Sequence, residues 1–98
     1  MYIKIHKAYR LIVALADSDL IGKRFEEGIR QLEVNPNFFK GEEKTKQEII
    51  KIIKKMKEED AIFNIVGKES VRIALESGVI GEHGIMKIQG VPVALGLM

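Results

Sequence analysis

The stretch Ala61–Gly78 constrains the fold more than any other part of this chain (AIFNIVGKESVRIALESG). It opens with Ile62–Val66, a run that is apolar apart from Asn64 and that stops at Gly67. Beyond this glycine, apolar residues recur at helical spacing until Gly78. A short apolar run bounded by glycine predicts a buried strand, and the spacing after it predicts a helix. The sequence therefore predicts a strand, a tight turn and a helix.

The N-terminal residues predict an antiparallel hairpin. Apolar and polar residues alternate over Met1–Lys7, which is the pattern of a half-buried strand. Tyr9–Ala16 is more apolar throughout and predicts a second, more central strand. Lys7 and Ala8 leave room only for a turn between the two strands.

The middle of the chain is less regular. Asp17 or Ser18 can cap a short helix over Asp19–Arg24. Alternation over Ile29–Val34 predicts a strand, and Asn35–Asn37 predicts a turn after it.

A second helix is predicted from Thr45, because Glu48 follows three residues later as in a capping box. We expect it to end near Glu58–Asp60. Its apolar stripe consists of Ile49, Ile52, Ile53 and Met56.

The C-terminal part predicts a strand over Ile85–Gln89, a turn at Gly90–Pro92 and an apolar end over Val93–Met98. The strands and helix over Ala61–Gln89 predict a β-α-β crossover with two parallel strands. The predicted fold class is α/β (mixed α+β), as one domain over residues 1–98. It has a single mixed sheet of about five strands packed by two to three helices.

Composition excludes several kinds of site. The chain has no cysteine, so it has no disulfide, no thiolate zinc site and no cysteine nucleophile. Its two histidines, His6 and His83, are far apart, so we expect no metal site and no cofactor. No catalytic motif is present, and the expectation leans away from an enzyme. No apolar run reaches the roughly 20 residues of a membrane span, so we expect a cytoplasmic location and no membrane partner.

An anion could bind where the predicted helix starts after Gly67, because the first N–H groups of a helix are free. Lys68 adds a positive charge there, and Asn64 adds a polar side chain in the strand before it. Gly22 and Lys23 form a second small basic turn that could also grip phosphate. These five residues are the candidate anion-binding site.

Simpler interpretations of the same residues are favoured. The segment is not a P-loop, because Ile62 stands where the first glycine belongs and Glu69 follows the lysine. Gly67 then serves a tight turn, Asn64 braces a neighbouring loop, and Lys23 is solvated surface charge.

Single-stranded RNA is the ligand suggested by the first strand. Tyr2, Lys4 and His6 share one strand face, Arg10 could join them across the hairpin, and no acidic residue precedes Asp17. Basic residues interleaved with an aromatic ring suit base stacking and phosphate contacts. The adjacent aromatics of the middle loop complete the candidate site: Phe38 and Phe39. The simpler interpretation is a hairpin with one face in water.

Several short motifs occur in a fixed order along nearly the whole chain. They are Asp-x-x-Leu-x-Gly-Lys at 17–23, Leu-Glu-Val at 32–34, Phe-Phe-x-Gly at 38–41, Asn-Ile-Val-Gly at 64–67 and Gly-Val-Pro at 90–92. This set resembles a family of small archaeal proteins known only as a domain of unknown function. The resemblance implies an archaeal, cytoplasmic, single-domain protein without an established activity, and the Ile, Lys and Glu content hints at a thermophile.

The C-terminal end departs from that family. In the family pattern, Gly-Val-Pro is followed by His-Ala-Gln, whereas Val93, Ala94 and Leu95 stand there in this chain. A ligand site that uses the family's His and Gln would be lost or altered here. The apolar end Val93–Met98 would then suit packing or a subunit contact.

Three functions follow, in this order. The first is a non-catalytic binding protein associated with RNA, the ribosome or the translation machinery. The second is a small enzyme or a protein that binds an anion or small ligand at the helix after Gly67. The third is an interaction subunit that uses Val93–Met98 as an edge strand for a partner or a homodimer.

Overall fold

Six strands form one mixed sheet in the structure, a computed structural model that describes residues 1–96. Their order is β5-β1-β2-β6-β8-β7. Their bounds are β1 Tyr2–Lys7, β2 Leu11–Ala16, β5 Glu42–Glu43, β6 Ile62–Val66, β7 Met86–Ile88 and β8 Val91–Leu95. A separate hairpin consists of β3 Arg24–Glu27 and β4 Arg30–Glu33. The predicted mixed α+β fold is confirmed, with six strands in the sheet instead of about five.

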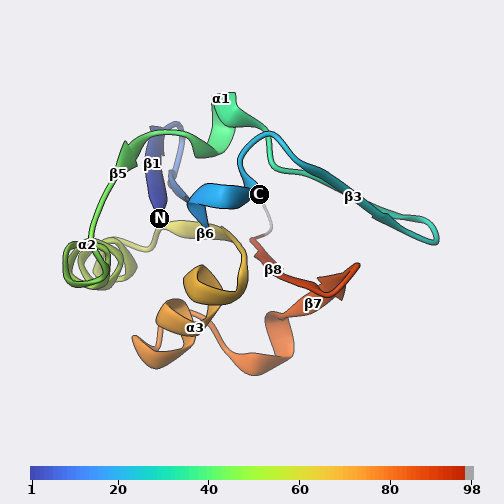
Figure 1. The fold of residues 1–98 in the computed structure, drawn as a ribbon. Helices are drawn as coiled ribbons and strands as arrows, with labels where there is room; N and C mark the ends of the chain where they lie inside the picture. The colour runs from blue at the N-terminus through green and yellow to red at the C-terminus, as the bar shows by residue number, and fades with distance from the viewer. Residues whose placement is uncertain (97–98) are drawn as a thin grey trace.

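Three α-helices and the small hairpin cover the two faces of the sheet. Helices α2 (Lys46–Glu58) and α3 (Lys68–Glu76) lie on one face, and α1 (Pro36–Phe39) lies with the β3–β4 hairpin on the other (Figure 1). Two 3-10 turns, η1 (Ser18–Leu20) and η2 (Glu82–Gly84), complete the regular elements of residues 1–96. Within residues 1–96, no helix has the length and apolar character needed to cross a bilayer.

Each face of the sheet has its own apolar core, because successive side chains of a strand point to opposite faces. On β2, Val13 and Leu15 pack toward α2 and α3, whereas Ala14 and Ala16 pack toward the hairpin and α1. All four side chains are fully buried. The central strand thus carries apolar residues on both faces, as its sequence predicted.

The N-terminal hairpin is confirmed. β1 and β2 are antiparallel, with Tyr2 opposite Ala16 and Lys7 opposite Leu11. The turn occupies residues 8–10, so the second strand begins two residues later than predicted. β2 is also hydrogen-bonded to β6, in parallel, and this contact joins the two halves of the chain.

The predicted crossover is present, but its two strands are not neighbours. β8 lies between β6 and β7 and is antiparallel to both, so β6 and β7 run in the same direction. β8 takes the inner position because Pro92, Val93 and Ala94 are all buried, whereas β7 buries only Ile88. The turn before β8 is correspondingly shorter than predicted, since β8 already begins at Val91.

The strand–glycine–helix unit is confirmed. β6 ends at Val66, Gly67 has φ +110° and ψ 155°, and α3 begins at Lys68. These dihedrals belong to a region that essentially only glycine adopts. A Cβ at Gly67 would also lie 2.3 Å from Cγ of Asp17. Both the backbone conformation and this close contact therefore require glycine at this position.

Helix α2 also follows its predicted pattern. The Thr45 hydroxyl accepts from the N–H of Glu48, and the Thr45 N–H donates to Oε1 of Glu48, so the capping box is complete. Ile49 and Ile53 of the predicted stripe are fully buried. The helix ends at Glu58, as expected.

The segment 18–39 differs most from prediction. The predicted helix over Asp19–Arg24 is wrong beyond Leu20, because Arg24 already begins strand β3. Gly28, with φ +62°, provides the turn that joins β3 to β4. The predicted strand therefore loses Ile29, which is in this turn and 101% exposed.

Candidate nucleic-acid interface

The side chain of Asn35 fixes the short helix α1 in place. Its Oδ1 accepts a hydrogen bond from the N–H of Asn37 at 2.8 Å, and Pro36 occupies the first helical position. The predicted turn at Asn35–Asn37 is thus the start of a helix. It turns Phe39 into the core, where only 4% of its surface is exposed, and leaves Phe38 half-buried.

Three residues of β1 meet this helix on one face of the sheet. His6 Nε2–H donates to the carbonyl of Phe38 at 2.8 Å, and the two rings stack with centroids 4.6 Å apart. Lys4 Nζ donates to the carbonyl of Asn37 at 2.8 Å. Tyr2 has the Lys40 ammonium 5.9 Å from its ring centroid.

We call this group the β1–α1 patch: Tyr2, Lys4, His6, Phe38 and Lys40. Tyr2, Lys4, His6 and Phe38 are half-buried, and Lys40 is exposed. One carboxylate lies at its edge, since Glu43 of β5 stands opposite Tyr2. Glu43 accepts a hydrogen bond from the Ser18 hydroxyl at 2.8 Å. The patch thus combines rings and cations, with the carboxylate of Glu43 at its β5 edge.

Arg10 does not join the patch. It lies in the β1–β2 turn, where its Nη2 donates to the carbonyl of Asp60 at 2.6 Å. The turn is three residues long, so Arg10 stands beyond the last β1–β2 pair and reaches toward the loop before β6. Its role in the structure is to join these two loops.

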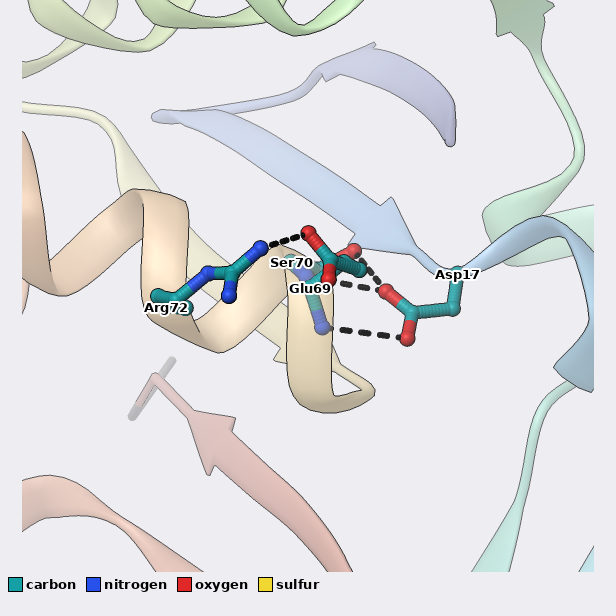
Figure 2. Close-up of polar contacts among 4 residues, drawn as sticks. All are labelled: Asp17, Glu69, Ser70 and Arg72. Carbon is teal, nitrogen blue, oxygen red and sulfur yellow. Dashed lines mark hydrogen bonds and ion pairs between the residues drawn. The ribbon is translucent and has the colours of Figure 1, made fainter.

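The start of α3 is capped from inside the protein. Asp17 follows β2 directly, and its carboxylate accepts from the N–H groups of Glu69 at 3.2 Å and Ser70 at 2.8 Å. It also accepts from the Ser70 hydroxyl at 2.7 Å (Figure 2). Figure 2 shows that Arg72 turns away from Asp17 and pairs with Glu69. The expectation of free N–H groups at this helix start is therefore wrong for Glu69 and Ser70.

Lys68 stands next to carboxylates. It lines a hollow of about 210 Å³ together with Asp17, Asp19, Leu20 and Pro92. Two acidic side chains in so small a space repel a bound anion. The geometry around Gly67 and Lys68 therefore gives an anion no advantage.

The other predicted anion-binding residues have structural contacts of their own. Asn64 Oδ1 accepts from the N–H of Gly96 at 3.1 Å, which is the loop-bracing role favoured from the sequence. Gly22 N–H donates to the Val34 carbonyl at 2.8 Å, and Val34 N–H donates to the Lys23 carbonyl at 2.9 Å. These bonds tie the segment before β3 to the segment after β4.

The C-terminal strand β8 lies between two other strands of the sheet. β8 is hydrogen-bonded to β6 on one side and to β7 on the other. Val93 is paired on both sides, whereas Ala94 and Leu95 are paired with β6 alone. An edge-strand contact through Val93–Met98 stays a prediction. Residues 97–98, which end the predicted Val93–Met98 contact, lie outside the described residues.

Two exposed groups at the start of α2 have shifted pKa values. A hydrogen bond with Glu42 raises the pKa of Lys44. Hydrogen bonds from the backbone and side chain of Thr45 lower the pKa of Glu48. Both shifts belong to the capping box and its flanking ion pairs.

Within residues 1–96, no three His, Asp or Glu side chains gather as a metal site.

Comparison with known proteins decides the family. The family model described as "Protein of unknown function (DUF424)" matches residues 6–96. This chain belongs to the DUF424 family. The predicted resemblance to a family of unknown function is thereby confirmed.

One solved structure shares the fold of this DUF424 protein. It is described as the crystal structure of an uncharacterized conserved protein from Methanopyrus kandleri. The TM-score is 0.80 at 22% sequence identity, over 99% of this chain and 93% of that one. At this identity the likeness concerns the fold alone. The comparison with curated proteins found no match.

The structural contacts of two residues of the DUF424 chain were missed in its sequence. Lys40 directly follows the paired phenylalanines, and its cation lies over Tyr2; a Phe-Phe-Lys run was the available signal. Asp17 was predicted as a cap for the wrong helix. It caps α3, more than fifty positions later, and only the parallel pairing of β2 with β6 brings the two together.

Proposed function

We propose that this DUF424 protein is a small non-catalytic binding protein that holds single-stranded RNA on the β1–α1 patch. The observation that carries the proposal is the convergence of predicted residues from two distant segments. Residues of β1 meet residues 37–40 across more than thirty positions of sequence. Lys4 bonds to the Asn37 carbonyl, His6 bonds to and stacks on Phe38, and the Tyr2 ring lies near the Lys40 ammonium. The cellular setting that we propose is RNA handling or the translation machinery of an archaeon.

The chemistry of the patch suits a flexible, unpaired strand. Rings stack with bases irrespective of sequence, and lysines neutralise phosphates along the backbone. A lysine ammonium has three N–H donors, and Lys4 uses one of them for the Asn37 carbonyl. Lys40 contributes a second exposed cation beside the Tyr2 ring. The patch therefore offers a ring, a stacked pair and two cations on one face.

The test measures binding of a fluorescently labelled oligouridine by anisotropy, over a series of salt concentrations. We expect affinity to fall as salt rises, because phosphate contacts release counterions. Lys40→Ala should weaken binding and reduce the slope of log K against log salt by about 0.7, the value for one phosphate contact on a single strand. Tyr2→Leu should weaken binding by roughly 1–3 kcal/mol if one base stacks there.

Two further variants separate the patch from general surface charge. Lys54→Ala removes an exposed lysine from α2, far from the patch in the fold, and should leave the salt slope unchanged. Glu43→Gln removes the carboxylate opposite Tyr2 and should strengthen binding. Equal losses in Lys40→Ala and Lys54→Ala, or no salt-dependent binding by the wild type, would refute the proposal.

A further inference from the structure

Strand β1 is paired along only half of its outer edge. β5 has two residues, Glu42 and Glu43, which pair with Ile3 and Tyr2. Backbone polar groups alternate between the two sides of an antiparallel strand. The Met1 carbonyl accepts from the N–H of Lys44, so the odd-numbered residues of β1 direct their backbone groups toward β5.

Beyond Ile3 this edge is open. Ile5 and Lys7 direct their N–H and C=O groups to the same side, and within residues 1–96 no backbone hydrogen bond reaches them there. The chain enters β5 at Gly41, where an added Cβ would lie 2.2 Å from the Ile3 oxygen. Before that point α1 packs over β1 and β2, on a face of the sheet and not beside its edge.

An apolar groove runs next to the open edge, between β1 and α2. It has a volume of about 500 Å³, with Ile5 and Leu11 on the sheet side and Ile52 and Met56 on the helix side. A second hollow of about 360 Å³ shares Ile5 and Ile52 and continues the groove toward Gly41. Ile5 is 38% exposed, although its neighbour Ile3 on the same face is 5% exposed.

The rim of this groove is positively charged. Lys7 and Lys55 line it, and Glu59 is the acid among its lining residues. In the described part of the chain, neither lysine has a carboxylate within ion-pair distance. Both lysines are therefore available to pair with an acidic segment. A second copy of this chain would place its own positively charged rim against them, and the two rims would repel each other.

We propose that this edge binds an extended acidic segment of a partner protein, which adds to the sheet as a strand in line with β5. Ile5 and Lys7 would supply main-chain hydrogen bonds, as in other cases of strand addition. Alternate apolar side chains of the segment would enter the groove, and its acidic residues would meet Lys7 and Lys55. This site lies on the opposite face of β1 from the β1–α1 patch and does not depend on RNA binding.

The test uses the labelled octapeptide EVEVEVEV as a probe in fluorescence anisotropy. The scrambled peptide EEEEVVVV has the same composition without the alternation, and KVKVKVKV has the opposite charge. We expect EVEVEVEV to bind at least about fivefold more tightly than either control, because only it combines the strand period with a complementary charge. Amide hydrogen exchange should slow at Ile5 and Lys7 when the probe is bound.

Matched variants test the two parts of the site. Lys55→Glu should weaken binding about fivefold, whereas Lys54→Glu makes the same charge change outside the groove and should have no effect. Lys7→Ala removes a charge, and Lys7→Pro also removes an edge N–H, so Lys7→Pro should bind more weakly. Lys55→Glu is on a helix surface, so it tests the proposal even if the proline variant fails to fold.

Three outcomes would overturn the inference. They are equal binding of EVEVEVEV and EEEEVVVV, equal losses in Lys54→Glu and Lys55→Glu, and a dimer in sedimentation that Lys7→Pro abolishes. The last result would assign the edge to a second copy. None of these outcomes bears on the RNA test, whose Tyr2 and Lys40 variants are on the other face of the sheet.

Discussion

Replacing Asp17 with alanine should destabilise the protein by about 3–4 kcal/mol, a large share of the 5–15 kcal/mol that typically stabilises a small domain. The carboxylate accepts three hydrogen bonds at the start of α3, from Glu69 N–H and from the N–H and hydroxyl of Ser70. Water can replace the carboxylate at Glu69, which is exposed, but not at Ser70, which is fully buried. Two bonds to a charged acceptor, at roughly 1.5–2 kcal/mol each, give the estimate.

Urea unfolding followed by circular dichroism measures this loss directly. In a thermal scan it corresponds to a fall in Tm of roughly 12–30 °C for a chain of this length. Asp17→Asn keeps an oxygen acceptor and loses only the charge, so about half of the loss should remain. Asp19→Ala is the control, because Asp19 is exposed and accepts no hydrogen bond among the described contacts.

The reasoning would be refuted by an Asp17→Ala variant within about 0.5 kcal/mol of the wild type, the usual range for surface substitutions. An equal loss in Asp19→Ala would also refute it. A double-mutant cycle with Ser70→Ala adds a further check. Residues in direct contact couple by about 0.5–3 kcal/mol, so additive losses at Asp17 and Ser70 would contradict the geometry.

Three more variants test other features. Gly67→Ala should cost about 2–4 kcal/mol in urea unfolding, because its φ of +110° is strained for alanine and its Cβ would overlap the capping carboxyl. Asn64→Ala should cost about 1–2 kcal/mol and speed hydrogen exchange at the Gly96 amide, since the buried bond between them is lost. Because the Thr45 hydrogen bonds lower the pKa of Glu48, their stabilisation is present above the ordinary carboxyl pKa and is lost as pH falls through the lowered value. The urea midpoint should therefore fall more between about pH 6 and about pH 3 in the wild type than in Glu48→Gln.

Local patterns in the sequence predicted the elements that local interactions determine. The Thr45–Glu48 capping box and the apolar stripe located α2, and the run before Gly67 located β6 and α3. Apolar alternation located β1. In each case the signal is complete within about a dozen residues, so no distant contact is needed to interpret it.

Distant contacts determine what the sequence did not show. β3 has charged residues at three of its four positions, so it carries no apolar period, and its pairing with β4 depends on the turn at Gly28. β8 takes the inner position in the sheet because the two cores bury more of its residues than of β7. Apolar and polar alternation predicted which β1 residues share a face of the β1–α1 patch. The stacking of Phe38 on His6 depends on how α1 packs against β1, which the sequence does not show.

The bond between Asp17 and α3 has a consequence for the alignment of the central strands. Asp17 follows the last residue of β2, whose partner in parallel β6 is Val66, and α3 begins two positions beyond that partner. A slip of one residue between the strands would shift the carboxylate by about 3.3 Å and turn it to the opposite side of the sheet. Ser70 would then be buried without an acceptor, so the misaligned sheet would be less stable than the native one. One acidic side chain thus distinguishes the native alignment from its nearest competitors.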